Sequence, residues 1–211
     1  MAHPGSNNAD TSDADLDLVD RIRAGDDDAW ALLLARHQDR LYSTCLRMVR
    51  DRELAMDLTQ DAMVKIIQGL DSFDARARLS TWMIRITMNV CLSKLRSEKL
   101  RRHASLEQMR EGDGSRDRPF IESREPGASS RVEQSEGRAL LSEGLMRLSD
   151  EHRAILILRD ARGLDYEQIA EVLTIAVGTV KSRLFRARSA LRDTIEELSG
   201  DRPRPINDPS S

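Results

Sequence analysis

The chain has 211 residues, of which 33% are charged and 3% aromatic, and its formal net charge is −3. No window of about 18 uninterrupted apolar residues occurs, which argues against a transmembrane helix, and the acidic start lacks the basic and apolar segments of a secretory signal. We therefore expect a cytoplasmic protein without membrane insertion. Alternating Val, Ile and Thr runs are missing as well, so the composition predicts an all-α fold, most simply as two small helical domains.

Charge is distributed unevenly along the chain. Residues 1–30 hold eight Asp against two Arg, whereas residues 76–102 hold eight basic side chains against one acid. Residues 176–192 hold five basic side chains and no acid. Two basic segments on an acidic background are typical of a protein that contacts a polyanion at defined places, even where the net charge is negative.

Neither the cysteines nor the histidines form a metal-binding pattern. Cys45 and Cys91 are far apart and outside any CxxC motif, and the four His have no second ligand at metal-binding spacing. No segment combines a nucleophile, a base and an oxyanion site. We therefore expect two reduced, partly buried thiols, no disulfide framework, no metal, no cofactor and no enzymatic activity.

Changes in pattern along the chain predict its domains. Residues 1–14 are polar and offer nothing to bury, which predicts a disordered acidic tail. Residues 15–97 carry apolar positions at helical period and predict one compact helical domain. The polar residues 98–135, with Gly, Pro and Ser, predict a linker. A second helical domain is expected over residues 136–198, and the Pro-rich residues 199–211 predict another disordered tail.

Helix boundaries are indicated by a few capping residues. In STWMIRITMNVCLSKLR, Ser80 or Thr81 is placed to cap a helix, and Trp82 is expected in the core rather than as a stacking platform. In the second domain Ser149 predicts the start of a helix and Gly163 its end.

The segment YEQIAEVLTIAVGTVKSRLFRAR, residues 166–188, predicts two helices joined by a tight turn. Asp165 and Gln168 have the spacing of a capping box at the start of the first helix. After the break at residues 174–176, apolar residues at steps of three and four predict the buried stripe of the second. Phe185 lies off that stripe among basic residues, where contact with a partner explains an exposed ring. The pattern favours a helix-turn-helix that reads the major groove over a merely solvated basic face.

This segment closely resembles the promoter-reading helix-turn-helix of bacterial sigma factors of the extracytoplasmic-function group, in the sigma-70 family. DLTQDAMVKI, residues 57–66, resembles the family's polymerase-clamp-binding helix. DSFDARARLSTWMIRITMNVCLSKLR, residues 71–96, resembles its segment for melting and reading the minus-ten element. The resemblance implies a sigma factor that binds the clamp and flap regions of core RNA polymerase, directs it to promoter DNA and helps to melt the minus-ten region. It also implies an anti-sigma partner.

The same resemblance implies three groups of contact residues. The polymerase-binding group is Asp57, Gln60 and Asp61. The minus-ten DNA group, which includes a loop that would hold a flipped base, is Phe73, Arg76, Arg78, Ser80, Arg85, Asn89 and Arg96. The minus-35 DNA group is Thr179, Lys181, Ser182, Arg183, Phe185, Arg186 and Arg188. In the turn, Thr174 stands where the family often has glycine, and Ala176 cannot cap the second helix through its side chain.

Two other interpretations of the sequence stay open. A helix-turn-helix regulator that acts by operator binding would bind DNA without polymerase, usually as a dimer. A helical adaptor with incidental basic faces would leave no DNA footprint. For a sigma factor, we expect weak promoter binding by the free chain, because each basic segment alone gives only salt-sensitive binding.

Overall fold

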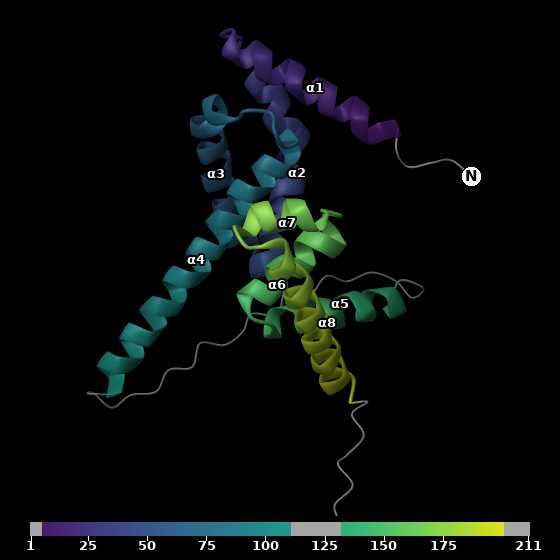
Figure 1. The fold of residues 1–211 in the computed structure, drawn as a ribbon. Helices are drawn as coiled ribbons and strands as arrows, with labels where there is room; N and C mark the ends of the chain where they lie inside the picture. The colour runs from purple at the N-terminus through teal and green to yellow at the C-terminus, as the bar shows by residue number, and fades with distance from the viewer. Residues whose placement is uncertain (1–5, 111–131, 201–211) are drawn as a thin grey trace, which may run out of the picture.

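A computed structural model describes residues 6–110 and 132–200, in which every regular element is a helix, confirming the all-α prediction (Figure 1). The first group of elements is α1 (Ser6–Arg23), α2 (Asp27–Val49), α3 (Arg52–Gly69), the 3-10 turn η1 (Leu70–Ser72) and α4 (Leu79–Arg110). The second group is α5 (Val132–Arg147), α6 (Asp150–Leu156), the π-helical turn η2 (Ile157–Ala161), α7 (Tyr166–Leu173) and α8 (Val177–Ser199). Within the described ranges, none of these helices combines the length and apolar character that a membrane crossing requires.

Side-chain caps explain where several helices begin and end. Asp26 accepts a hydrogen bond from the backbone N–H of Asp28 at the start of α2, and Asp51 caps α3 in the same way. Ser149 caps α6 as predicted, with its Oγ 3.3 Å from the backbone nitrogen of His152. Gly163 has φ of +70° just after η2, a conformation that glycine adopts without steric cost, so the predicted end of this helical segment is also confirmed.

The core of the first group lies where α2, α3 and α4 pack together. Its largest side chains with almost no exposed surface are Leu33, Leu41, Met48, Leu58, Ile66, Leu70, Met83, Ile84 and Met88. Trp82 packs against this core at the start of α4, as expected, and its ring lies 5.5 Å from that of Phe73 between centroids. The predicted helical domain therefore has a continuous apolar interior.

In the second group α8 is the central helix, in contact with α5, α6 and α7. Its inward stripe contains the buried Val180, Leu184 and Ala187, three of the positions that the sequence predicted. Gly144 lets α5 approach α8 closely, because a Cβ atom there would lie 3.2 Å from side-chain carbons of Leu191 and Ile195. This packing leaves the opposite face of α8 uncovered.

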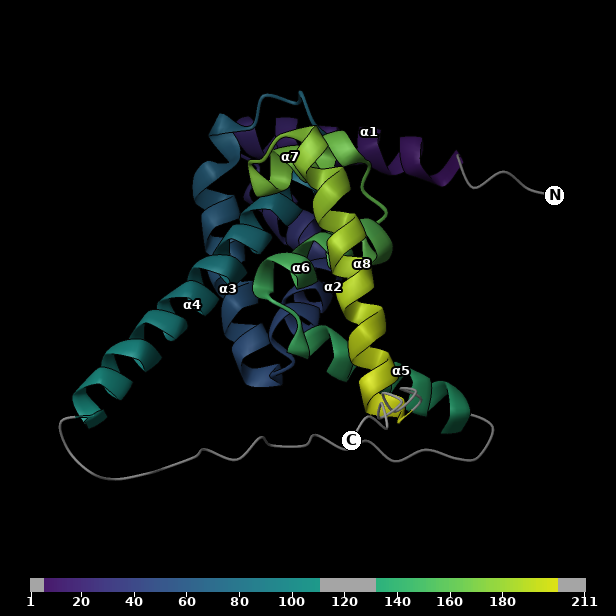
Figure 2. The ribbon, with the colours of Figure 1, turned by 60° about the horizontal axis from the view of Figure 1, so that its bottom comes forward.

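The two groups of helices pack against each other. In both views α7 lies beside the N-terminal half of α4, while the C-terminal half of α4 extends away from the other helices (Figures 1 and 2). Arg162 reaches from the second group to Ser43 on α2, with its Nη2 2.7 Å from Ser43 Oγ. Burial, together with the nearby charges of Arg40 and Arg47, lowers the pKa of Arg162 to about 10. The domain contact therefore contains a partly buried cation beside two others.

Helix covers parts of two segments that the sequence predicted to be unstructured. Helix α1 begins at Ser6, inside the predicted tail 1–14, and α4 and α5 extend into the predicted linker 98–135 from its two ends. Adding residues to an existing helix costs little because each one gains a backbone hydrogen bond. Residues 111–131, and the tail beyond residue 200, lie outside the described residues.

The predicted cap of α4 is wrong. The helix begins at Leu79, and the carbonyl of Arg78 accepts hydrogen bonds from the backbone nitrogens of Thr81 and Trp82. Ser80 and Thr81 are therefore inside the first turn, and Thr81 is buried with its Oγ1 3.5 Å from Gln168 Nε2 of α7. The tertiary contact with α7 uses the hydroxyl that the sequence suggested as a cap.

Candidate nucleic-acid interface

The second domain contains the predicted helix-turn-helix, formed by α7 and α8. The capping box at its start is complete: the backbone nitrogen of Gln168 lies 2.8 Å from Asp165 Oδ1, and that of Asp165 lies 3.0 Å from Gln168 Oε1. Thr174 ends α7 at φ 54° and ψ 50°, the left-handed conformation that glycine prefers. Ala176 begins α8 without a side-chain hydrogen bond, as its chemistry predicts.

The outer face of α8 presents an aromatic ring between polar and basic groups. Phe185 is 78% exposed, the highest value among the large exposed apolar side chains of the described residues. Lys181, Ser182 and Arg186 are exposed around it, and Arg186 Nε lies 3.3 Å from the carbonyl oxygen of Ser182. A ring held at the surface beside cations suits a DNA groove, where bases offer apolar edges and phosphates offer charge.

Two other members of the minus-35 group are bound to acids of their own domain. Arg183 Nη2 lies 3.3 Å from Glu151 Oε2, and Arg188 Nη2 lies 2.7 Å from Asp160 Oδ1. The hydrogen bond to Asp160 raises the pKa of Arg188. Thr179 is half-buried beneath this face. The predicted group thus has two parts. Among the described residues, those around Phe185 form no ion pair with an acid, whereas Arg183 and Arg188 would have to exchange a carboxylate partner for a DNA phosphate.

The minus-ten group lies on the loop before α4 and on α4 itself. Arg85, Asn89 and Arg96 follow one another at steps of four and seven, which places them on one side of the helix. Asn89 and Arg96 are exposed, and Arg85 is partly exposed with its Nη1 3.4 Å from Glu171 Oε1 of α7. The three side chains therefore share one face of α4, but Arg85 is paired with Glu171 of α7.

The loop contributes fewer free groups than the sequence predicted. Phe73 is only 3% exposed, because its ring packs into the core beside Trp82, so in this structure the side chain does not face the solvent from which DNA would approach. Arg76 is paired with Asp74 at 3.0 Å, with both side chains largely in solvent. Arg78 is exposed at the end of the loop, and Ser80 is half-buried.

The polymerase-binding group lies on the outer face of α3. Asp57, Gln60 and Asp61 are all exposed there. Three large apolar side chains share the exposed part of the helix: Met56 is 56% exposed, Val64 51% and Ile67 43%. Exposed apolar side chains in one place mark a protein contact surface. No sequence motif pointed to these three side chains, although each lies off the buried face of this helix.

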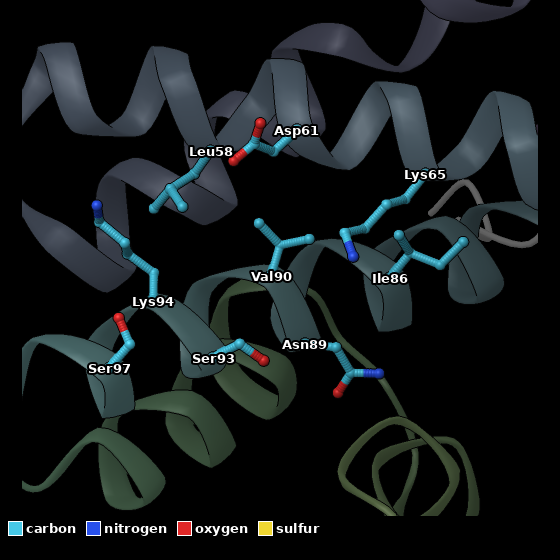
Figure 3. A pocket seen from close by; sticks show the side chains of 9 residues that line it. All are labelled: Leu58, Asp61, Lys65, Ile86, Asn89, Val90, Ser93, Lys94 and Ser97. Atoms are coloured by element: carbon cyan, nitrogen blue, oxygen red, sulfur yellow. The ribbon is translucent and has the colours of Figure 1, made fainter. Parts of the chain in front are cut away.

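A groove with a volume of about 520 Å³ lies on the surface between α3 and α4 (Figure 3). Leu58, Asp61 and Lys65 line it from α3, facing Ile86, Val90 and Lys94 on α4 in the close view. Asn89, Ser93 and Ser97 complete the α4 side. Asp61 and Asn89 belong to different predicted groups, so the surfaces predicted for polymerase and for the minus-ten strand adjoin at this groove.

In the described ranges 6–110 and 132–200, no group of three or more His, Cys, Asp or Glu side chains is arranged so that it could hold a metal ion. The chemistry that the surfaces offer is recognition: cations for phosphates, amide and hydroxyl groups for base edges, and apolar groups for a protein. The fold and its surfaces together define a two-domain DNA-binding protein with a helix-turn-helix second domain.

Comparison with known proteins identifies the family. The sequence matches Sigma-70 region 2 over residues 33–101 and Sigma-70, region 4 over residues 138–191. The RNA polymerase sigma-H factor of Pseudomonas aeruginosa is 31% identical over 191 residues, which cover 89% of this chain and 97% of the relative. The ECF RNA polymerase sigma factor SigW of Bacillus subtilis is 29% identical, over 85% and 96% of the two chains.

Solved structures agree with this assignment. The sigma factor RpoE of Bartonella quintana, in complex with the anti-sigma factor NepR, matches with a TM-score of 0.58 at 26% identity and covers 80% of this chain and 96% of its own. The chain belongs to the sigma-70 family, in its extracytoplasmic-function (ECF) group. It is a sigma factor, which binds RNA polymerase and directs transcription initiation to specific promoters.

Proposed function

We propose that each exposed surface of this sigma factor has one role in initiation. The face of α8 around Phe185 reads the minus-35 element, the stripe Arg85–Asn89–Arg96 on α4 contacts the melted minus-ten strand, and the outer face of α3 binds the polymerase clamp. The observation that carries the proposal is the 78% exposure of Phe185 beside Arg186 on the second helix of a helix-turn-helix. All three roles are binding roles, so the protein acts without making or breaking a covalent bond.

Surface chemistry supports the division of these roles. Single-stranded DNA is held by cations along its backbone and by polar or flat groups at its bases, which the α4 stripe and its neighbouring loop supply. A protein partner requires apolar anchors, which Met56, Val64 and Ile67 supply beside the acids of α3. The clamp partner is thus expected to present basic and apolar groups to this helix.

The contact between the domains has a consequence for promoter binding. Glu171 of α7 forms an ion pair with Arg85, and the side chain of Gln168 on the same helix contacts Thr81. DNA that engages Arg85 must displace the carboxylate, so the free chain binds the minus-ten strand less well than the same surface held open on polymerase. The RpoE relative from Bartonella quintana is held by an anti-sigma factor, and we propose a partner of that kind for this chain in the cytoplasm.

Transcription in vitro tests the assigned roles. Core polymerase free of sigma is combined with the wild-type chain on a genomic promoter library, and the transcripts that appear supply the promoter for the variants. Phe185→Ala and Arg186→Ala should each lower initiation about 5-fold or more, since a specific base contact contributes about 1–3 kcal/mol. Arg192→Ala, also exposed on α8 but two turns from Phe185, is the matched control and should retain activity.

The alternative functions give different results in the same experiments. A DNA footprint produced by the chain alone at physiological salt, with no transcripts on addition to core polymerase, would indicate an operator-binding regulator. Equal activity of Phe185→Ala and Arg192→Ala would remove the α8 face from promoter recognition, while the sigma function would stand.

A further inference from the structure

The two cysteines of the chain meet inside the first domain. Cys45 lies on α2 and Cys91 on α4, and their Sγ atoms are 3.6 Å apart although 46 residues separate them in sequence. Both side chains are fully buried. These are the two cysteines in the whole sequence, so a thiol at either position has one possible partner within the chain. The separation is that of two sulfurs in contact, and a disulfide bond would bring them to about 2.05 Å.

The two thiols differ in their chemistry. The thiol of Cys91 donates a hydrogen bond to the sulfur of Cys45, and this bond is the main cause that lowers the pKa of Cys45 against the opposing effect of burial. The positive charge of Arg162 from the second domain acts in the same direction. The same hydrogen bond and burial raise the pKa of Cys91. Cys45 is therefore the thiol that ionises first and attacks an oxidant, and Cys91 is the one that remains protonated beside it.

We propose that Cys45 and Cys91 form an oxidation site that a small peroxide converts into a disulfide between α2 and α4. The Cys45 thiolate attacks one peroxide oxygen, the O–O bond breaks, and Cys45 becomes a sulfenic acid while hydroxide leaves and takes up a proton to form water. The Cys91 sulfur then attacks the sulfenic sulfur, an S–S bond forms, the S–O bond breaks, and a second water leaves with the Cys91 proton. Two thiols are oxidised and one peroxide is reduced to two waters.

The location of the pair determines what its oxidation does. A disulfide here ties α2 to α4 and closes a loop that contains α3 and the segment before α4, which carry the polymerase-binding and minus-ten surfaces. Because both sulfurs are buried, the peroxide reaches them through local opening of the helices, and oxidation proceeds at the rate of that opening. Because Cys91 lies in contact with Cys45, its thiol reacts with the Cys45 sulfenic acid before a second peroxide can oxidise that sulfur to sulfinic acid.

Mass spectrometry of the full chain tests the proposal. The reduced chain is treated with hydrogen peroxide under native conditions at low protein concentration, free thiols are blocked with iodoacetamide, and the product is analysed without reduction. We expect a monomer that has lost two hydrogen atoms, takes up no iodoacetamide and yields one peptide pair joined through Cys45 and Cys91. Two thiols that remain free, disulfide-linked dimers, or sulfinic acid at either cysteine would each overturn the proposal.

A second measurement on the wild-type chain avoids core substitutions. In glutathione buffers of graded ratio, the disulfide should form in the native chain at a glutathione disulfide concentration at least about tenfold lower than in urea, because the fold holds the sulfurs together. Equal or weaker disulfide formation in the native chain would refute the argument from proximity.

Discussion

Removal of the Arg153 side chain should destabilise both the second domain and its contact with the first. Its side chain is 4% exposed, and its guanidinium donates hydrogen bonds to the carbonyl oxygens of Leu145, Met146, Leu148 and, across the domain boundary, Met48. These carbonyls lie near the ends of α2 and α5, where helices leave acceptors without intrahelical partners. Burial lowers the pKa of Arg153, and the nearby Asp150 partly offsets this effect.

The size of the effect follows from these bonds. Arg153→Met keeps a long side chain of similar volume and removes every donor, so the cost is that of stranded acceptors and not that of a cavity. A hydrogen bond from a charged donor contributes about 1.5–3 kcal/mol net, and two of the four bonds, to Met48 and Leu148, are buried. Counting those two and subtracting the desolvation of the guanidinium, we expect a loss of about 3 kcal/mol, or a Tm lower by about 6–12 °C.

Thermal unfolding followed by far-ultraviolet circular dichroism measures this loss. Arg147→Met is the matched control, because Arg147 is half-exposed on the neighbouring helix and pairs with Glu143 at 2.9 Å in an i, i+4 arrangement. Such a pair is worth about 0.3–0.5 kcal/mol, so the control should shift Tm by about 2 °C at most. If Arg153→Met shifted Tm no more than Arg147→Met does, the guanidinium would not be what joins these helix ends.

Three further predictions concern pH, the turn and the domain contact. Burial raises the pKa of Asp15, but His37, whose Nε2 lies 3.1 Å from Asp15 Oδ2, and the hydrogen bond from Arg36 outweigh it and lower the pKa below the usual 3.8. The carboxylate therefore stabilises the fold at neutral pH and loses this effect as the pH falls below about 4, so urea unfolding should show Asp15→Asn about 1 kcal/mol less stable at pH 7 and nearly equal to wild type near pH 3. Thr174→Gly should increase the free energy of unfolding by about 0.5 kcal/mol and so raise Tm slightly. Glycine removes the steric strain of a β-branched residue at φ 54°, and this gain exceeds the cost of the entropy that glycine adds to the unfolded chain; a lower Tm would contradict this. Glu171→Gln frees its arginine partner on α4 and should tighten binding of a minus-ten single strand about 2- to 3-fold at low salt, measured by fluorescence anisotropy, and unchanged affinity would show that the pair does not compete with DNA.

Local sequence signals predicted the helix-turn-helix in detail. The capping box at Asp165 and Gln168 needs residues three apart, and the inward stripe of α8 needs steps of three and four, so both can be read without knowing the fold. The exposure of Phe185 follows from the same periodicity, because a residue off the stripe cannot reach the core. These features depend on neighbours within one helical turn.

Features that depend on distant segments could not be predicted from the sequence. Phe73 has no periodic signal in its loop, and its burial depends on Trp82, whose ring it meets, and on the side chain of Arg23, which donates a hydrogen bond to its carbonyl. Cys45 and Cys91 come into contact because α2 and α4 happen to pack in one register, which no spacing in the sequence indicates. The resemblance to a family supplied roles for residues, but it did not supply their packing partners in this chain.

The two proposed DNA-reading surfaces differ in the described fold, because different kinds of contact cover them. Phe185 and its polar neighbours face solvent with no acid against them, so the α8 face can meet duplex DNA without any rearrangement. Arg85 holds a carboxylate of the other domain at 3.4 Å, in a pair that is about two-fifths exposed on each side. Solvent screens such a pair, so it is weak enough for a DNA phosphate to displace, whereas the buried bonds of Arg153 are not. We therefore expect access to the proposed minus-ten surface to depend on how far α7 moves from α4, and separation of the domains also requires breaking the buried hydrogen bond from Arg153 to Met48.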